Sequence, residues 1–216
     1  MKLKLLMTAV AAVASFAGAA RADDAFTPKA KGMWILNVRI SDALPVANSS
    51  INTKAGAATG LKVQATDSIM PTLGVSYFLT DNIALEVIAG TTLHTVKAVG
   101  TGVNVAVHDT WLLPPTLTAQ YHFNPKGKYS PYVGAGAGYM LFYNGADKNG
   151  YSVHLSDGFG PVVQGGLDVA LSGRWSANLD VKKVFFQPNA NINGGALSSK
   201  VNLDPVVVSV GGGYRF

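Results

Sequence analysis

The residues best able to do chemistry in this sequence of 216 residues are four histidines, and their spacing argues against a shared site. His94, His108, His122 and His154 lie on different segments, and no pair has the spacing of a metal-binding motif such as HExxH. Cysteine is absent, which excludes a thiolate zinc site and a disulfide framework. We therefore predict no metal site and no cofactor, and we interpret the histidines as single polar or loop residues.

Two other patterns imitate a binding or catalytic motif. The glycine string Gly134–Gly138 looks like a phosphate-binding loop, but it lies within a predicted strand and no helix follows it to receive a phosphate. Asp180 and Lys182 share one face of a predicted strand, where an internal ion pair explains them better than an acid–base couple. No GxSxG nucleophile elbow is present. We predict that the protein is not an enzyme. A lipid-acting Ser/His pair that converges only in the fold stays open as an alternative.

The elements that position these residues are predicted to be strands with a different solvent on each face. Residues Trp111–Phe123 alternate between apolar and more polar side chains, over a length well beyond the five or six residues usual in soluble strands. A tilted membrane-spanning strand needs about 9–11 residues. The same alternation predicts eight strands along the chain. They are Gly32–Ile40, Ser68–Leu79, Ile83–Val96, Asp109–Phe123, Tyr129–Tyr143, Asp157–Leu171, Trp175–Phe186 and Pro205–Phe216.

The connections between the predicted strands alternate in length. Tight polar turns at residues 80–82, 124–128 and 172–174 alternate with longer Gly-, Asn- and Ser-rich segments at residues 41–67, 97–108, 144–156 and 187–204. Short periplasmic turns and long external loops are typical of outer-membrane barrels. The outward register also places aromatic residues near both ends, as expected where rings lie at two membrane interfaces. These are Trp34, Tyr77, Tyr121, Phe123, Tyr129, Trp175, Tyr214 and Phe216 at the turn end, and Trp111, Tyr143, Phe159 and Phe185 at the loop end.

Alternation alone leaves open which face points outward, because a lipocalin-like barrel holds its apolar face around a ligand. Charged residues make up only 13% of the chain, against about 25–35% on a soluble surface. The polar face has few charges, and their mixed signs fit pairing within a narrow lumen. They are Arg39, Glu86, Asp168, Asp180, Lys182 and Arg215. We therefore predict an all-β, eight-stranded antiparallel transmembrane barrel with its apolar face toward lipid.

The first 22 residues have the features of a secretory signal. Lys2 and Lys4 precede the apolar run Leu5–Ala20, and Ala20-Arg21-Ala22 offers small residues at both positions read by a signal peptidase. Removing this leader lowers the formal net charge from +5 to +2, because it carries three basic and no acidic residues. No Lys/Arg cluster remains to indicate nucleic-acid binding. We expect cleavage near Ala22, a barrel domain at residues 23–216, and a location in the outer membrane.

Five prolines lie in the loop-side halves of the predicted strands that run down from the long connections. They are Pro71, Pro114, Pro115, Pro161 and Pro205. Each removes a backbone N–H from the strand ladder. Pro205 and Pro71 fit the start of a strand, whereas Pro114-Pro115 and Pro161 lie too deep for that account. Our hypothesis is that neighbouring strands are incompletely paired there, which leaves a side opening between the lumen and the bilayer.

Several apolar residues are predicted to face inward near the level of these prolines. They are Met70, Leu112, Met140, Phe142, Val162 and Phe186. Such side chains would line an apolar pocket below the loops. Together with Pro114, Pro115 and Pro161 they make up the predicted hydrophobic pathway.

The segment Trp111–Leu117, reading WLLPPTL, resembles the LPPT-type wall segment of the OmpW/AlkL family of small outer-membrane proteins. The similarity covers nearly the whole mature chain. It includes Gly32–Val38, the YHFNPKGKYSPYVGAGAGY run at Tyr121–Tyr139, the segment Asp157–Asp168 and the terminal Tyr214–Phe216. A C-terminal Phe216 behind alternating apolar residues also looks like the signal read by the barrel assembly machinery.

The resemblance implies an eight-stranded barrel with a hydrophobic lumen and a lateral exit for small apolar molecules. Solutes would enter from the loop side, avoid the polar lipopolysaccharide layer and leave sideways into the outer-membrane lipid. The family has no catalytic residues to transfer. The expected function is therefore a passive channel for small hydrophobic solutes. The alternative is a closed structural barrel whose extracellular loops bind partners.

Overall fold

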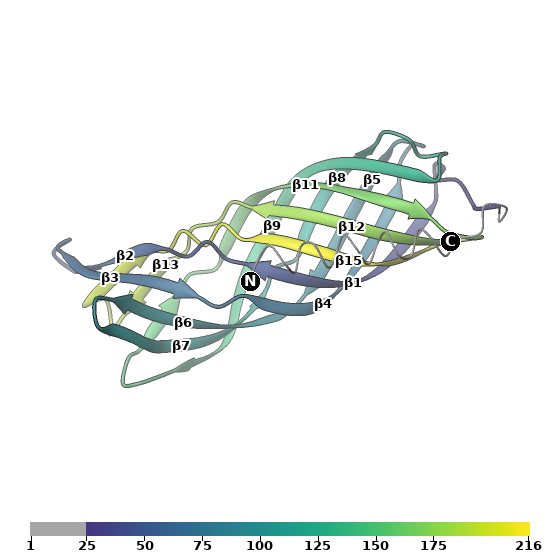
Figure 1. The fold of residues 1–216 in the computed structure, drawn as a ribbon. Helices are drawn as coiled ribbons and strands as arrows, with labels where there is room; N and C mark the ends of the chain where they lie inside the picture. The colour runs from purple at the N-terminus through teal and green to yellow at the C-terminus, as the bar shows by residue number, and fades with distance from the viewer. Residues whose placement is uncertain (1–24) are drawn as a thin grey trace.

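The computed structural model describes residues 25–216, so the predicted signal peptide at residues 1–22 lies outside the described residues. This part of the chain forms an elongated antiparallel barrel whose strands tilt across the long axis (Figure 1). Within residues 25–216, no helix is long and apolar enough to cross a membrane. Strands position most of the side chains of the lumen and of the wall.

Eight strands close the half of the barrel that carries the short turns. In spatial order they are β1 (Trp34–Leu44), β4 (Ser68–Phe78), β5 (Ile83–Gly90), β8 (Thr116–His122), β9 (Tyr129–Asp147), β11 (Gly158–Ala170), β12 (Trp175–Val184) and β15 (Val206–Arg215). Each pairs antiparallel with the next, and β15 pairs with β1 to complete the ring. The predicted eight-stranded antiparallel barrel is confirmed.

The loop-side half differs from the prediction, because much of the sequence expected to form loops is strand. The additional strands are β2 (Ser49–Thr53), β3 (Ala58–Ala65), β6 (Thr92–Gly100), β7 (Val103–Leu113), β10 (Val153–Leu155), β13 (Asn189–Ile192) and β14 (Leu197–Lys200). They extend the wall beyond the closed ring in Figure 1. Ile51, Val63, Val153 and Ile192 are buried in one apolar cluster, and this burial stabilises strands that local composition does not favour.

The two faces of the wall have opposite polarity, as predicted. Side chains of the outward set are apolar and exposed, and those of the inward set are buried. Examples of exposed residues are Val38, Ile69, Leu73, Val87, Leu117 and Val133. Aromatic rings pair on the outer face near both ends, for example Trp175 with Tyr214 and Trp111 with Tyr143. This surface matches a lipid-facing band bordered by two aromatic belts.

Glycine allows the lumen side of the narrow ring to close. A Cβ atom added at Gly136 would lie 2.0 Å from the carbonyl oxygen of Leu117 on β8, so only glycine permits this approach. At Gly166 an added Cβ would lie 2.4 Å from the ring of Tyr132. The glycine string Gly134–Gly138 therefore has a packing role inside β9, consistent with its interpretation as a strand segment.

Candidate functional site: the lumen and its wall

A network of paired charges fills the turn-side half of the lumen. Glu86 is fully buried and accepts bonds from Arg39 at 2.7 Å and from Lys182 at 3.0 Å. Lys182 also contacts Asp180 at 2.6 Å, as predicted for this pair. Tyr132 donates to Asp180 at 2.7 Å and links the pair to another strand. Because each buried charge here faces an opposite charge or a polar partner, the network is a stable barrier rather than an open aqueous channel.

A second cluster seals the periplasmic mouth, and its central residue was not predicted from the sequence. Lys29 is almost fully buried, and its Nζ donates to Asp168 at 2.5 Å, to His122 Nδ1 at 2.9 Å and to Ser130 at 3.0 Å. It belongs to the segment 25–33, which precedes β1 and folds across the mouth. The backbone of this segment bonds to two of the short turns, through Thr27 to Gly173 and through Lys29 to Pro125.

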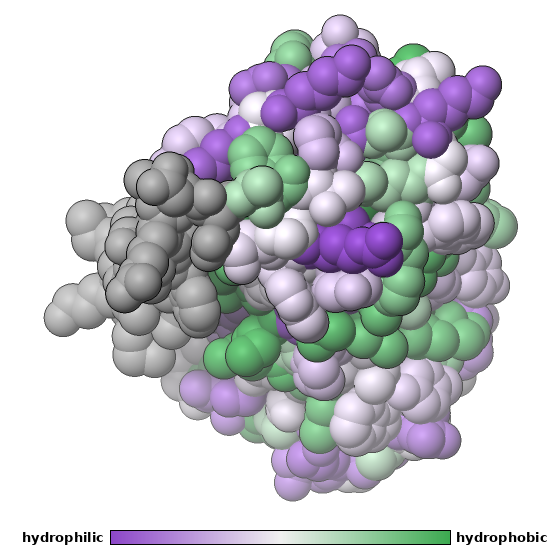
Figure 2. Space-filling model, turned by 90° about the vertical axis from the view of Figure 1, so that its right-hand side faces the viewer, coloured by the Kyte–Doolittle hydropathy of each residue, from purple (hydrophilic) through white to green (hydrophobic). Residues whose placement is uncertain are grey.

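The outer surface of this end shows the same closure. Figure 2 faces the short-turn end. In the part of this end that is not drawn in grey, atoms pack closely and hydrophilic side chains lie among hydrophobic ones. Five of the six charges predicted to pair in the lumen do so, and Lys29 is the added cation that compensates Asp168. The sixth, Arg215, forms no ion pair within residues 25–216 and donates to the backbone carbonyl of Thr27.

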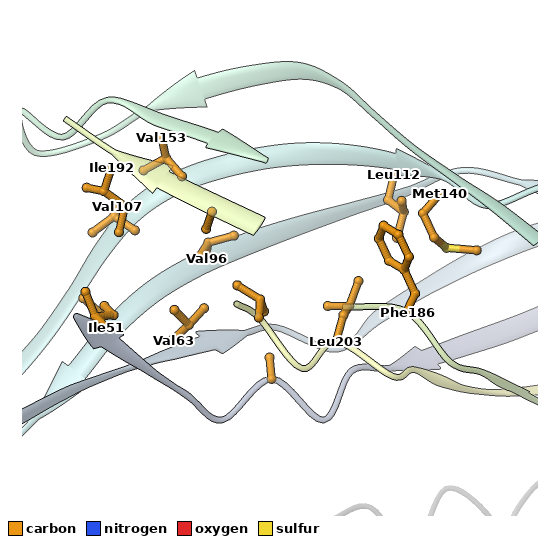
Figure 3. Close-up of a cluster of buried hydrophobic side chains, with 14 of the residues drawn as sticks. Ile51, Val63, Val96, Val107, Leu112, Met140, Val153, Phe186, Ile192 and Leu203 are labelled. Carbon is orange, nitrogen blue, oxygen red and sulfur yellow. The ribbon is translucent and has the colours of Figure 1, made fainter. Parts of the chain in front are cut away.

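The loop-side half of the lumen has the opposite chemistry. Its buried side chains form one apolar cluster, drawn in Figure 3, that extends along the barrel from Ile51 and Ile192 near the loops to Met140 and Phe186 near the middle. Four residues of the predicted pathway belong to this cluster, namely Leu112, Met140, Val162 and Phe186, and Phe142 packs against it. Met70 is buried at its lower border.

Two small apolar cavities lie within this half. The lower one has Met70, Leu112, Pro114 and Met140 in its lining, and the upper one has Leu112 and Phe142. Each holds about 30 Å³, roughly the volume of one water molecule, and its lining is almost wholly apolar. We call this region, with its two cavities, the apolar chamber. A larger solute has to displace side chains in order to occupy it.

The change from polar to apolar lining occurs within one inward step on several strands. Going from turn side to loop side, the pairs are Ser41 and Ala43, Thr72 and Met70, Thr116 and Pro114, Gln164 and Val162, Lys182 and Val184, and Ser209 and Val207. At the border, the hydroxyl of Ser41 bonds to Thr72 at 2.8 Å and to Ser209 at 2.7 Å. The polar half therefore ends in hydrogen-bonded hydroxyls, directly under the apolar chamber.

The wall is interrupted at this border. β7 ends at Leu113 and β8 begins at Thr116, so Pro114 and Pro115 separate two strands that the sequence had predicted as one. The pairs Ile88–Thr116 and Thr92–Leu112 belong to one unbroken register, yet the three residues between them on one strand do not pair with the three on the other. This missing stretch of ladder lies at the prolines where the sequence predicted incomplete strand pairing.

The chain that lies opposite these prolines, just after β5, also lacks ladder pairing on the side that faces β4. Pairing of β4 with β5 stops at Thr72–Gly90, so residues 68–71, including Pro71, have no ladder partners on residues 91–94. The ring of His94 spans this gap, since its Nδ1 bonds to the carbonyl of Thr66 at 2.7 Å. Thr91 therefore lies between two interrupted ladders.

The other two prolines occupy different surroundings. Pro161 lies within β11, pairs in register with Ala137 of β9 and points outward rather than into the lumen. Pairing of β11 with β12 extends up to Val162–Val184, and above it Phe185 bonds to the carbonyl of Pro161. Pro205 precedes β15 and accepts a bond from Val184, as suits a residue that starts a strand. The structure thus places Pro71, Pro114 and Pro115 around one interruption of the wall. Pro205 faces Pro114 across the lower cavity, and Pro161 lies apart on the outer face.

The histidines lie apart from one another, and one of them meets a serine: Ser130 Oγ lies 3.4 Å from His122 Nδ1, and both side chains are buried in the lower network. In residues 25–216, no group of three or more His, Asp or Glu side chains could hold a metal ion. His122 belongs to the lower network, His94 spans the wall gap, and His108 contacts Asp147 near the loops at 2.9 Å.

Known proteins similar to this chain include outer-membrane proteins. The outer-membrane protein y4mB of Sinorhizobium fredii is 41% identical, over 85% of this chain and 80% of its own. Outer membrane protein W of Escherichia coli is 36% identical over 67% and 71%, and the dibenzothiophene metabolism operon protein PahQ of Pseudomonas aeruginosa is 23% identical over 85% and 88%.

Two solved structures share the fold at 25% sequence identity. OprG of Pseudomonas aeruginosa superposes with a TM-score of 0.83, covering 89% of this chain and 99% of OprG. AlkL in lipid bilayers gives a TM-score of 0.71, covering 91% and 95%. The OmpW family profile matches residues 30–216. With its lipid-facing barrel, paired aromatic belts and outer-membrane relatives, this chain is an outer-membrane protein that belongs to the OmpW family.

Proposed function

We propose that this protein is a passive conduit for small hydrophobic molecules, without catalytic turnover. Solutes enter the apolar chamber from the loop side and leave sideways into the membrane at Pro114-Pro115. The observation that carries the proposal is the coincidence of two borders. The apolar lining ends, and the wall ladder is interrupted, at the same level of the barrel.

The charged network explains why the exit is lateral. An apolar solute that reached the level of Ser41 would have to displace hydrogen-bonded hydroxyls and then separate Glu86 from Arg39 and Lys182. Breaking a buried ion pair costs several kcal/mol, whereas lipid tails are as apolar as the chamber itself. The missing backbone pairs beside Pro114-Pro115 leave the shortest route from the apolar chamber to the lipid tails.

The relatives support the class of solute. PahQ is named for an operon of dibenzothiophene metabolism, and dibenzothiophene is a small apolar aromatic molecule. The chamber lining of Leu112, Met140 and Phe186 suits such molecules, because it offers no hydrogen-bond partner that would select for polar ones.

The smallness of the two cavities favours the second candidate, a closed barrel whose extracellular loops bind partners. At about 30 Å³ each, the cavities hold no solute of naphthalene size without rearrangement. The two candidates differ in whether the chamber widens, so transport measurements separate them.

The test is uptake of labelled naphthalene by cells that lack their own copy of the protein. We expect the wild type to accelerate uptake, and Pro114→Thr/Pro115→Thr to remove most of the acceleration. A restored N–H at residue 114 faces Gly90 and allows the interrupted ladder to close, while residue 115 faces β9. Pro131→Thr is the matched control, since Pro131 faces outward on β9 at the turn end, away from both the interruption and the chamber. Heat-modifiability on gels establishes folding of each variant. If the folded wild type does not accelerate uptake, the closed-barrel candidate is supported instead.

The C-terminus is proposed to direct assembly. Phe216 is exposed on the outer face, its ring packs edge-on against Tyr214, and its N–H bonds to the carbonyl of Trp34 on β1. An apolar terminal aromatic in this position fits recognition by the barrel assembly machinery.

A further inference from the structure

A polar cleft splits the outer face of the wall on the loop side. Below it Ala43 pairs with Ser68, and above it Ser49 pairs with Val63, but the segments 45–48 and 64–67 between these pairs have no ladder bonds to each other. The cleft measures about 520 Å³, far more than either apolar cavity. Its lining is mostly polar and includes Asn48, Gln64, Thr66, Asp67 and Lys97.

The cleft opens outward rather than into the lumen. Gln64 on β3 and Lys97 on β6 are cross-strand partners, and each alternates with buried residues that face inward. Figure 1 shows β3 and β6 side by side at the loop end. The chamber and the cleft are therefore on opposite sides of the same wall.

Lys97 differs from the other lysines that lie beside carboxylates. Lys29, Lys126, Lys148 and Lys182 each contact an Asp or Glu, whereas Lys97 has no hydrogen bond or ion pair within residues 25–216. The side chain of Gln64 likewise has no bond to this part of the chain. Donors of this kind are available to a ligand in the cleft.

Two further lysines extend the positive charge over the same outer surface. Lys62 is exposed on β3, two residues from Gln64, and is a diagonal neighbour of Lys97, which places their Cα atoms about 7–8 Å apart. Lys200 is exposed at the end of β14, which pairs with β2, while β2 in turn pairs Ser50 with Lys62. Like charges on adjacent strands destabilise each other, so an anion between them would be favourable.

The height of the cleft matches the headgroup layer of the outer leaflet. Leu93 is exposed to lipid and pairs with Trp111 of the loop-side aromatic belt. Lys97 lies four residues further along β6, which for a strand tilted by about 40° is about 10 Å above the belt. Directly below the cleft, Ile40 and Ile69 are among the most exposed apolar side chains, and they offer a surface for acyl chains.

We propose that this cleft binds the phosphorylated sugar headgroup of an outer-leaflet glycolipid. Lys97 and Lys62 pair with its phosphate, and Asn48 and Gln64 bond to sugar hydroxyls. Asp67, at the membrane edge, accepts a hydrogen bond from another sugar hydroxyl. An inorganic phosphate ion has no sugar hydroxyl to donate to Asp67. The acyl chains lie along Ile40 and Ile69. This site is independent of solute transport, because it lies outside the lumen.

The experiment measures binding of fluorescent lipopolysaccharide to the purified protein in phospholipid nanodiscs. Replacing two lysines near the surface, Lys62→Gln/Lys97→Gln, should weaken binding about tenfold or more. The control Lys31→Gln/Lys54→Gln makes the same change of charge at two exposed lysines away from the cleft, and should stay within about twofold of wild type. Equal affinity of the cleft variant and wild type, or equal loss in the control, would overturn the proposal.

Two additional arms identify the part of the ligand that is recognised. Dephosphorylated lipopolysaccharide should bind the wild type about as weakly as lipopolysaccharide binds the cleft variant. Millimolar inorganic phosphate should not displace lipopolysaccharide; displacement would reduce the cleft to a simple anion site and contradict the headgroup assignment. Naphthalene uptake by Lys62→Gln/Lys97→Gln should equal that of wild type, so a failure of the transport proposal leaves this test intact.

Discussion

The two halves of the lumen are built from the same eight strands but have opposite linings: one is charged and filled, and the other is apolar and has cavities. In the turn-side half, Glu86, Arg39 and Lys182 satisfy one another and exclude any continuous water path. In the loop-side half, small cavities lie among mostly apolar side chains, including Leu112 and Met140. On several strands the lining changes from polar to apolar between two successive inward-facing residues.

This contrast teaches that closure and permeability need not conflict in a narrow barrel. The charged half keeps the membrane sealed whatever happens above it. The apolar half can then rearrange, because side-chain movement there breaks no ion pair. An interruption of the wall is tolerable only at the border, where the lumen beside it is already as apolar as lipid.

The largest expected effect comes from breaking the charged half at its centre. Glu86→Gln leaves Arg39 and Lys182 without their shared carboxylate, so unfolding free energy should fall by about 3–5 kcal/mol. Urea unfolding of the protein in lipid, followed by tryptophan fluorescence, measures the loss. The matched control is Asp81→Asn, which removes an exposed pair with Lys126 and should cost no more than about 1 kcal/mol. Similar losses in both variants would mean that the network does not stabilise the lower half.

The second prediction separates the periplasmic seal from the solute route. Lys29→Met should destabilise the protein less than Glu86→Gln, because Asp168 keeps its 2.6 Å bond from Asn178. Ion conductance in planar bilayers and naphthalene uptake should both stay at the wild-type level, because the Glu86 network still closes the lumen. A rise of uptake would show that solutes leave through the mouth, against the lateral route.

A smaller effect on stability, with a large effect on transport, is expected in the apolar half. Leu112 lines both cavities, so Leu112→Trp fills them at a cost of about 1–3 kcal/mol for overpacking. Naphthalene uptake should fall to the level of cells without the protein. Leu117→Trp is the control, since Leu117 faces lipid, where a larger side chain is accommodated. Uptake that survives a filled chamber would place the solute path elsewhere.

The smallest effect concerns a loop-side carboxylate outside both halves. The pKa of Asp147 is lowered from its ordinary value, because the backbone N–H of Val153 and the ring of His108 bond to its carboxylate. Its stabilising contribution is therefore complete above the ordinary pKa of an aspartate and is lost as the pH falls through the lowered value. Hydrogen-exchange protection of the Val153 amide should decrease from pH 6 to pH 3. In Asp147→Asn this decrease should be absent, since an asparagine does not titrate.

The sequence was sufficient for the ring of eight strands, because a two-residue period sustained over segments as long as Trp111–Phe123 matches a strand and not a helix. The loop-side strands β2, β3, β10, β13 and β14 were missed, whereas the predicted strands Ile83–Val96 and Asp109–Phe123 covered parts of β6 and β7. Their alternation lasts only four to eight residues in β3, β13 and β14, and Gly and Asn interrupt it. Burial against distant segments, which local pattern does not encode, makes these residues strands.

The candidate site was predictable in composition but not in pairing. The inward charges were identified by their strand face, yet Arg39 meets Glu86 only because of strand order, which brings together residues far apart in the chain. Lys29 escaped prediction since the segment 25–33 has no periodicity. The break at Pro114-Pro115 followed from the missing N–H groups, whereas the unpaired state of Thr91 on both sides depends on Pro71 in another strand.

The central claim, that apolar solutes occupy only the loop-side half and leave at the border, is tested most directly by photolabelling. A small aryl diazirine is equilibrated with the protein in nanodiscs, activated, and the labelled residues are located by mass spectrometry. Lipid-facing residues such as Leu73 become labelled in any case, so only inward residues are informative. We predict labels at Leu112, Met140 and Phe186, and none at Ser41, Thr72 or Asp168. Labels on the polar set, or none in the apolar chamber, would contradict the account.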